Sequence, residues 1–125
     1  MKADKYIDVL IPRGGGGLIR SVKQNSTIPV IQTGEGNCHV YLHKDANPDY
    51  VVPIVVNAKV QRPGVCNAIE SLLVDDEAAD ELLPDVLRAL SEHGVVIHAD
   101  EHASSIARSV DVEIVPATDD DWGTE

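Results

Sequence analysis

The chain has 125 residues, and 43% of them are hydrophobic, which is enough for one folded domain with an apolar core. Because Phe is absent and aromatic residues make up only 3%, that core must consist of aliphatic side chains. The formal net charge of −11 disfavours binding to nucleic acid or to an anionic membrane. No apolar run approaches the roughly 20 residues that span a bilayer, and two cysteines without an apolar leader predict free thiols in a reducing, cytoplasmic setting.

The N-terminal part predicts a strand, a glycine-rich turn, a helix and a second strand. Residues 6–11 are apolar and predict a buried strand, and residues 28–32 predict a short one. Between them, Arg13 and the four glycines at 14–17 lead into residues 18–23, which have helical spacing. Such a turn can cradle an anion, because glycines allow close approach and a helix N-terminus presents N–H groups. Its spacing matches neither common phosphate-binding motif, so a flexible turn is an equally good interpretation.

Residues 38–43 predict a strand with two different faces. Alternation places Cys38, Val40 and Leu42 on one face. The other face carries His39, Tyr41 and His43. The two histidines would lie about 13 Å apart along an extended strand, which is too far for one zinc ion, so we predict no metal site.

The remaining chain predicts helices that alternate with strands. Residues 50–60 also suit a strand, but their apolar positions recur at helical spacing, and Asn47 or Asp45 can cap a helix there. Further strands are predicted at 70–74, 95–98 and 112–115, and a short helix at 101–109. This order predicts an α/β fold, with an open, mostly parallel sheet flanked by helices.

The clearest helix starts after Asp75 or Asp76, runs to about Glu92 and is stopped by Gly94. Its apolar residues recur on one side and predict a buried stripe of Ala79, Leu82, Leu83, Val86, Leu87 and Leu90. The acidic residues of the same helix are expected to form a solvated face.

One stretch has the features of a reactive thiol. Cys66 follows a Pro-Gly turn, and two cations, Lys59 and Arg62, precede it. A loop position, nearby positive charge and free backbone N–H groups all favour the thiolate, which is the nucleophilic form. From composition alone, a small cysteine packed in a loop is the more common case.

Motifs around this cysteine occur in order along essentially the whole chain. The two longest are residues 29–41 (PVIQTGEGNCHVY) and 57–70 (NAKVQRPGVCNAIE), and shorter ones lie at 10–15, 72–74, 82–84 and 98–100. Together they resemble gamma-glutamyl phosphate reductase, also called glutamate-5-semialdehyde dehydrogenase, of the aldehyde dehydrogenase superfamily. Members of that family are a few times longer, so we expect the chain to be an internal piece.

The resemblance implies an aldehyde-dehydrogenase-like catalytic fold, with residues 1–36 ending the nucleotide-binding domain and residues 37–125 forming part of the catalytic domain. It implies NADPH-dependent reduction of L-glutamate 5-phosphate to L-glutamate 5-semialdehyde in proline biosynthesis, through a thioester on Cys66. The implied partners are this small-molecule substrate and, for the complete enzyme, further copies in a homo-oligomer. The 125 residues alone are expected to be inactive, because most cofactor contacts would lie outside them.

Three residues near the cysteine are candidates for binding the substrate. Lys59 and Arg62 can hold its phosphate or carboxylate, or stabilise the thiolate. Solvated charge at a helix end is an equally good interpretation for both, since the helix macrodipole favours cations there. Asn67 can donate to the substrate or cap the turn.

The resemblance places other residues at the cofactor. Arg13, Gly14 and Gly15 are expected beside the nicotinamide cofactor, and Glu125 is expected to correspond to the glutamate that bonds the nicotinamide ribose. Aldehyde-oxidising relatives carry a Glu that activates water, and Gln32 takes its place here. An amide is no general base near pH 7, so this difference suits a thioester that meets phosphate instead of water.

Two other functions fit the same features. One is a different thioester-forming member of the superfamily, such as a CoA-acylating aldehyde dehydrogenase. The other is a non-catalytic α/β binding module that keeps the cysteine loop and uses its acidic surface for a protein partner.

Overall fold

The structure is a computed structural model that describes residues 2–32, 34 and 36–123. The chain divides into two compact units, Met1–Glu35 and Gly36–Glu125. The assignment of residues 1–36 to a nucleotide-binding domain and of 37–125 to a catalytic domain stays a prediction. No helix among the described residues is long and apolar enough to cross a membrane.

The described residues of the first unit form one helix and one strand-like pairing. Helix α1 spans Gly16–Asn25, and Leu10 forms an isolated parallel bridge with Val30. The predicted buried strand at residues 6–11 is wrong: Tyr6 is 88% and Ile11 70% exposed, and these residues make only the single bridge at Leu10. The strand predicted at residues 28–32 is also reduced to this bridge. A strand needs a partner along its length to satisfy its backbone groups, and the bridge supplies one at a single residue of each segment.

The described residues of the second unit form two pairs of parallel strands. Strand β1 (Cys38–Leu42) pairs with β2 (Ile69–Val74), and β3 (His98–Ala99) pairs with β4 (Val115–Pro116). The predicted α/β class with parallel strands is confirmed, although the described strands form two two-stranded sheets. The predicted strands at 95–98 and 112–115 are shorter and lie toward the C-terminal end of each segment.

The β1–β2 pair has a bulge at its start. Cys38 is opposite Ile69, but the next residue, His39, is opposite Ser71, so Glu70 is the extra residue on β2. Bulges bend a strand and re-aim side chains, and they recur beside functional sites.

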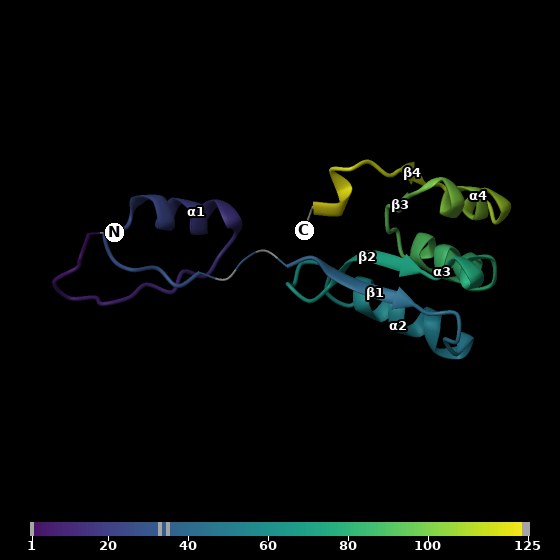
Figure 1. The fold of residues 1–125 in the computed structure, drawn as a ribbon, viewed down its shortest axis with the longest axis horizontal. Helices are drawn as coiled ribbons and strands as arrows, with labels where there is room; N and C mark the ends of the chain where they lie inside the picture. Colours follow the sequence, from purple (N-terminus) through teal and green to yellow (C-terminus); the bar gives the residue numbers. More distant parts are fainter. Residues whose placement is uncertain (1, 33, 35, 124–125) are drawn as a thin grey trace. The chain divides into compact units, whose positions relative to one another are not determined.

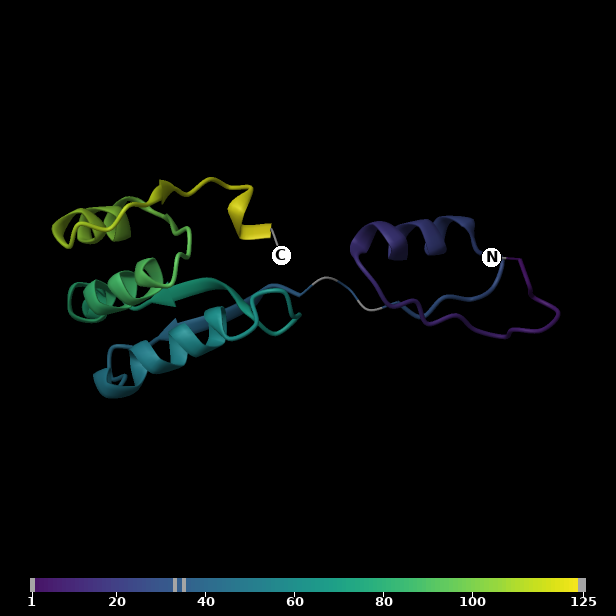
Figure 2. The ribbon, with the colours of Figure 1, turned by 180° about the vertical axis from the view of Figure 1, so that it is seen from behind.

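One face of the β1–β2 pair is covered by two helices, α2 (Pro48–Val60) and α3 (Ala79–Glu92), as Figure 1 shows from one side and Figure 2 from the other. The predicted faces of β1 are confirmed: Leu42 lies in the core, Cys38 and Val40 pack against it, and His39 and Tyr41 are exposed. The main cluster of buried residues is shared by both strands and both helices and consists of Leu42, Val51, Val55, Ile69, Ala78, Leu82, Val86 and Leu90.

Helix α3 connects this core to a second one, on the side of α4 (Glu101–Ser109). The second core contains Ala79, Leu83, Leu87, Ile106, Ala107 and Val112. All six apolar residues predicted for the stripe of α3 are therefore buried, and the prediction is confirmed. The helix is preceded by a 3-10 turn, η1 (Asp76–Ala78), and the chain leaves it through Gly94 at φ 72°, a conformation that glycine adopts without steric cost.

Candidate active site

Cys66 lies in an exposed turn between α2 and β2. The turn is held by short backbone hydrogen bonds, in which Val65 donates to Arg62 at 3.3 Å and Ala68 donates to Val65 at 3.0 Å. Ala68 is only 2% exposed, so the end of the turn is anchored in the core, while Cys66 is exposed. Both Cys66 and the half-buried Cys38 are free thiols, as predicted. The turn thus presents a sulfur to solvent on a fixed backbone.

Lys59 closes the base of this turn. Its ammonium donates a hydrogen bond of 2.8 Å to the backbone carbonyl of Ile69, the first residue of β2. The bond joins the last turn of α2 to the start of β2 and spans the eight intervening positions, 61–68. The cation predicted to bind substrate therefore also fixes the loop that carries the thiol.

The start of β1 holds the turn from the other side. The thiol of Cys38 donates to the carbonyl oxygen of Cys66 at 3.4 Å. The backbone N–H of Cys38 donates at 2.6 Å to the carboxylate of Glu70, the bulge residue. Gly36 approaches so closely that a Cβ there would lie 3.2 Å from the Cys66 carbonyl oxygen. Sequence reasoning missed all three contacts, because each joins residues about 30 positions apart.

Arg62 and Asn67 are exposed in the same turn as Cys66. Within the part of the chain that the structure describes, neither side chain makes a hydrogen bond or an ion pair. Their guanidinium and amide groups are therefore accessible to a ligand that approaches Cys66. The structure thus brings Lys59, Arg62, Cys66 and Asn67 into one segment of the second unit.

The residues predicted at the cofactor lie in the first unit or beyond the described chain. Gly14 has φ 152°, a backbone conformation that favours glycine, and a Cβ there would also lie 2.7 Å from the end of the Leu18 side chain. Gly15 is the N-cap of α1 and provides no side-chain cap. Arg13 is exposed just before it. Glu125 lies outside the described residues.

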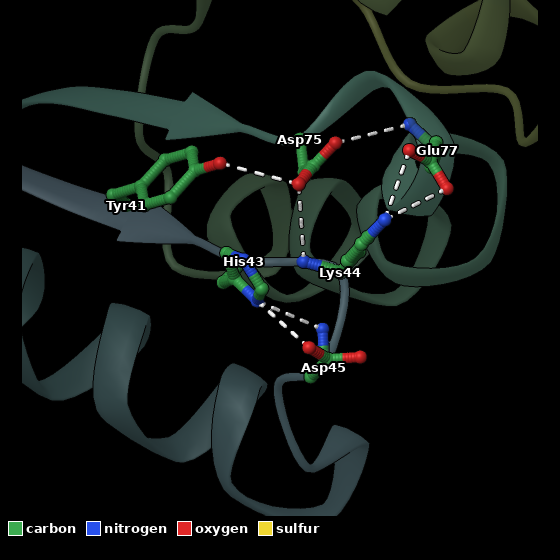
Figure 3. Close-up of polar contacts among 6 residues, drawn as sticks. All are labelled: Tyr41, His43, Lys44, Asp45, Asp75 and Glu77. Atoms are coloured by element: carbon green, nitrogen blue, oxygen red, sulfur yellow. Dashed lines mark hydrogen bonds and ion pairs between the residues drawn. The ribbon is translucent and has the colours of Figure 1, made fainter.

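A polar cluster lies at the opposite, carboxyl ends of β1 and β2 (Figure 3). One carboxylate oxygen of Asp75 accepts from the Tyr41 hydroxyl at 3.2 Å and from the Lys44 N–H at 3.4 Å, and the other accepts from the Glu77 N–H at 3.3 Å. The Lys44 ammonium also pairs with Glu77 at 3.1 Å. This cluster joins the two strand ends and caps η1.

The same contacts shift two pKa values. Partial burial alone would raise the pKa of Asp75, but hydrogen bonds from Glu77, Tyr41 and Lys44 to its carboxylate outweigh it and hold the pKa below its usual value. Partial burial raises the pKa of Tyr41, and its bond to the Asp75 carboxylate raises it further. Because all partners come from the chain itself, we interpret this cluster as structural.

A cavity of about 460 Å³ lies beside β2, and the sequence did not predict it. Lys59 and Glu70 line it together with apolar residues of α3, such as Leu83 and Leu87. The 3-10 turn η2 (Asp121–Gly123) lines it as well, through Asp121 and Trp122. The cavity therefore reaches the same two side chains, Lys59 and Glu70, that hold the base of the Cys66 turn.

Two contacts hold η2 in place. His98 Nδ1 lies 2.9 Å from Asp121, and the side-chain amide of Asn37 donates to the Trp122 carbonyl at 3.0 Å. The N–H of Thr118, then His98 and the Thr118 hydroxyl, lower the pKa of Asp121 through their hydrogen bonds to its carboxylate.

Comparison with known proteins shows first the fold and then a more specific resemblance. No protein-family model matches the sequence. An acetylating aldehyde dehydrogenase from Geobacillus thermoglucosidasius superposes on 88% of this chain and 28% of its own, with a TM-score of 0.55 and 24% identity. The chain thus has an α/β fold like that of part of this aldehyde dehydrogenase, and the predicted fold class is confirmed.

A more specific match is the crystal structure of gamma-glutamyl phosphate reductase from Thermotoga maritima, which covers 97% of this chain with a TM-score of 0.86 and 46% identity. Gamma-glutamyl phosphate reductases from Agathobacter rectalis and Moorella thermoacetica are 56% and 53% identical over all 125 residues. The resemblance to gamma-glutamyl phosphate reductase is thus confirmed along the whole chain. The chain spans 30% and 29% of the length of these two relatives.

Proposed function

We propose that the protein carrying this chain reduces L-glutamate 5-phosphate to L-glutamate 5-semialdehyde and phosphate, in proline biosynthesis and in the cytoplasm. One observation carries the proposal: an exposed free thiol, Cys66, sits on a braced turn, within a chain that is 56% identical to a named reductase over its whole length.

Cys66 is the proposed nucleophile. Its thiolate sulfur attacks the carbonyl carbon of the acyl phosphate, and a C–S bond forms. The C–O bond to phosphate then breaks, phosphate leaves with the electron pair, and a γ-glutamyl thioester remains on Cys66. Among the described residues, the backbone N–H groups of Cys66 and Asn67 donate to no acceptor, so both can stabilise the oxyanion that develops during the attack.

The side chains around the turn have separate proposed roles. Arg62 is a planar cation without a protein partner among the described residues, which suits bidentate binding of the phosphate or the substrate carboxylate. Asn67 can donate from its amide to the substrate. Lys59 already uses one ammonium N–H on Ile69, so its role is to fix the loop and to add positive charge beside it.

The glycine-rich turn of the first unit fits a nucleotide phosphate. Added Cβ atoms at Gly15 and Gly17 would meet nothing within 4 Å, and no side chain caps α1, so the first N–H groups of that helix are open to an anion. Arg13, Gly14 and Gly15 would hold NADPH there. A contact between Glu125 and the nicotinamide ribose stays a prediction from the resemblance. When bound, NADPH supplies the hydride that converts the thioester to the aldehyde. Gln32, which is exposed, provides no base to activate water.

The test is the reverse reaction of the full-length protein. We expect formation of NADPH from L-glutamate 5-semialdehyde and NADP⁺ to require phosphate, and Cys66→Ala to abolish it while the thermal unfolding midpoint is kept. Near-normal turnover by Cys66→Ala would contradict the proposed nucleophile. If coenzyme A replaced phosphate as the required acceptor, the protein would be a CoA-acylating aldehyde dehydrogenase instead.

The 125 residues alone are proposed to be inactive, because the chain spans only 30% of the length of its relatives. Assaying the isolated chain beside the full-length protein checks this, and measurable NADP⁺-dependent turnover by the isolated chain would contradict it.

A further inference from the structure

We propose that Cys38 is a positioning residue, which aims the backbone N–H of Asn67 at the oxyanion by holding the Cys66 carbonyl. The inference rests on the proposed function, in which Cys66 is the nucleophile. It concerns a residue that does not touch the substrate and acts only through the peptide that follows Cys66.

The contact itself is short and one-sided. The Cys38 thiol lies 3.4 Å from the Cys66 carbonyl oxygen, to which it donates. The described residues supply that oxygen with no backbone donor. The Cys38 thiol is therefore the hydrogen-bond donor that the described chain provides to the carbonyl of the proposed nucleophile.

Cys38 is itself held firmly. Its N–H donates at 2.6 Å to the Glu70 carboxylate, and a bond to a charged acceptor is stronger than one between neutral groups. Glu70 is the bulge residue of β2, so its side chain takes the place of a regular ladder partner for Cys38. Gly36 allows the approach, because a Cβ there would lie 3.2 Å from the Cys66 oxygen.

Because of the geometry of a peptide bond, the contact between Cys38 and the Cys66 carbonyl also sets the direction of the Asn67 N–H. The carbonyl of Cys66 and the N–H of Asn67 belong to one planar trans peptide, since no cis peptide bond occurs among the described residues. In such a unit the oxygen and the hydrogen point to opposite sides. When the Cys38 thiol fixes the oxygen on one side, the Asn67 N–H points away on the other side, free for the oxyanion.

The experiment compares Cys38→Ala, Cys38→Ser and Val40→Ala in the full-length protein. We expect Cys38→Ala to lower kcat about threefold to tenfold, with a change in KM for the semialdehyde below about twofold, since the Asn67 N–H, a donor that acts mainly in the transition state, is no longer aimed. Serine retains a donor, so Cys38→Ser should keep kcat within about twofold of the wild type. Val40 packs on the core from the same strand, so Val40→Ala should lower the unfolding midpoint but not kcat.

A second measurement distinguishes a misdirected Asn67 N–H from a general loss of order in the Cys66 turn. Iodoacetamide reacts with the Cys66 sulfur without forming an oxyanion, so its rate at Cys66, followed by peptide mass spectrometry, should be unchanged in Cys38→Ala. The inference is overturned if Cys38→Ala keeps full kcat, if Cys38→Ser loses as much as Cys38→Ala, or if alkylation falls together with kcat. If Cys66→Ala retains turnover, the proposed function itself has failed.

Discussion

The ammonium of Lys59 donates a hydrogen bond of 2.8 Å to the backbone carbonyl of Ile69. This bond closes the loop of Cys66 at its base, where α2 ends and β2 begins. It also explains why a lysine, with a long flexible stem, stands at this helix end. The nearby Arg62 has no such bond among the described residues, so the two cations before Cys66 are not equivalent.

Replacing this lysine tests how much the loop depends on the bond. We expect Lys59→Met to destabilise the full-length protein by about 1.5–3 kcal/mol, the usual contribution of a hydrogen bond from a charged donor, and to lower kcat. Thermal unfolding and turnover measure the two effects. Lys23→Met, at an exposed position of α1, is the matched control and should change neither. An unchanged midpoint for Lys59→Met would show that the bond contributes nothing to stability.

Because α3 is shared by two cores, we expect a large loss of stability when Leu87, which is 3% exposed, is replaced. Leu87→Ala should cost about 2–5 kcal/mol, because it removes buried methyl groups and leaves a cavity. Leu73→Ala deletes the same atoms at a position that is 44% exposed, so it should cost less than about 1 kcal/mol. Comparison of the two unfolding midpoints checks the prediction, and equal shifts would contradict the described packing.

The lowered pKa of Asp75 predicts a dependence of stability on acid. The carboxylate binds its proton less readily in the folded protein than in the unfolded chain, so its contribution is complete above the unfolded pKa of about 3.9 and is lost as the pH falls below it. Unfolding midpoints between pH 7 and pH 2.5 should therefore fall less steeply for Asp75→Asn. Glu81→Gln, at an exposed position of α3, should follow the wild type. Parallel curves for wild type and Asp75→Asn would refute the assignment.

The N-terminus of α4 depends on one side chain. Asp100 accepts the N–H of Ala103 at 2.8 Å, which is the geometry of a helix N-cap. Asp100→Ala should cost about 0.5–2 kcal/mol and speed hydrogen exchange in the first turn of α4, whereas Asp100→Ser should behave almost like the wild type. Exchange that is equally slow in all three proteins would mean that the cap is dispensable.

Elements with a strong local pattern could be predicted from the sequence. The apolar stripe of α3 and the alternation along β1 depend on residues within one element, and both were correct. The exposed position of Cys66 after a Pro-Gly turn was correct for the same reason. The strand at 6–11 failed because an apolar, β-forming segment becomes a strand only when a neighbour pairs with it, and Leu10 alone finds one.

The contacts that brace the site could not be predicted. The bulge at Glu70 has no local signature, since it depends on how β1 and β2 align. The thiol of Cys38 and the carbonyl of Cys66 meet across 28 positions of sequence. The charge of Lys59 predicts a place near the site. Its acceptor is a main-chain oxygen, and the sequence does not show which backbone group will lie close to a side chain.

Gly36 offers a way to shift the Cys66 peptide by substitution. A Cβ at this position would lie 3.2 Å from the carbonyl oxygen of Cys66, which is closer than an ordinary van der Waals contact. A graded series of small residues at position 36 would therefore displace the Cys66 peptide by successive fractions of an ångström without replacing any residue that performs chemistry. Such a series of variants would measure how steeply the reaction rate depends on the position of the Cys66 peptide.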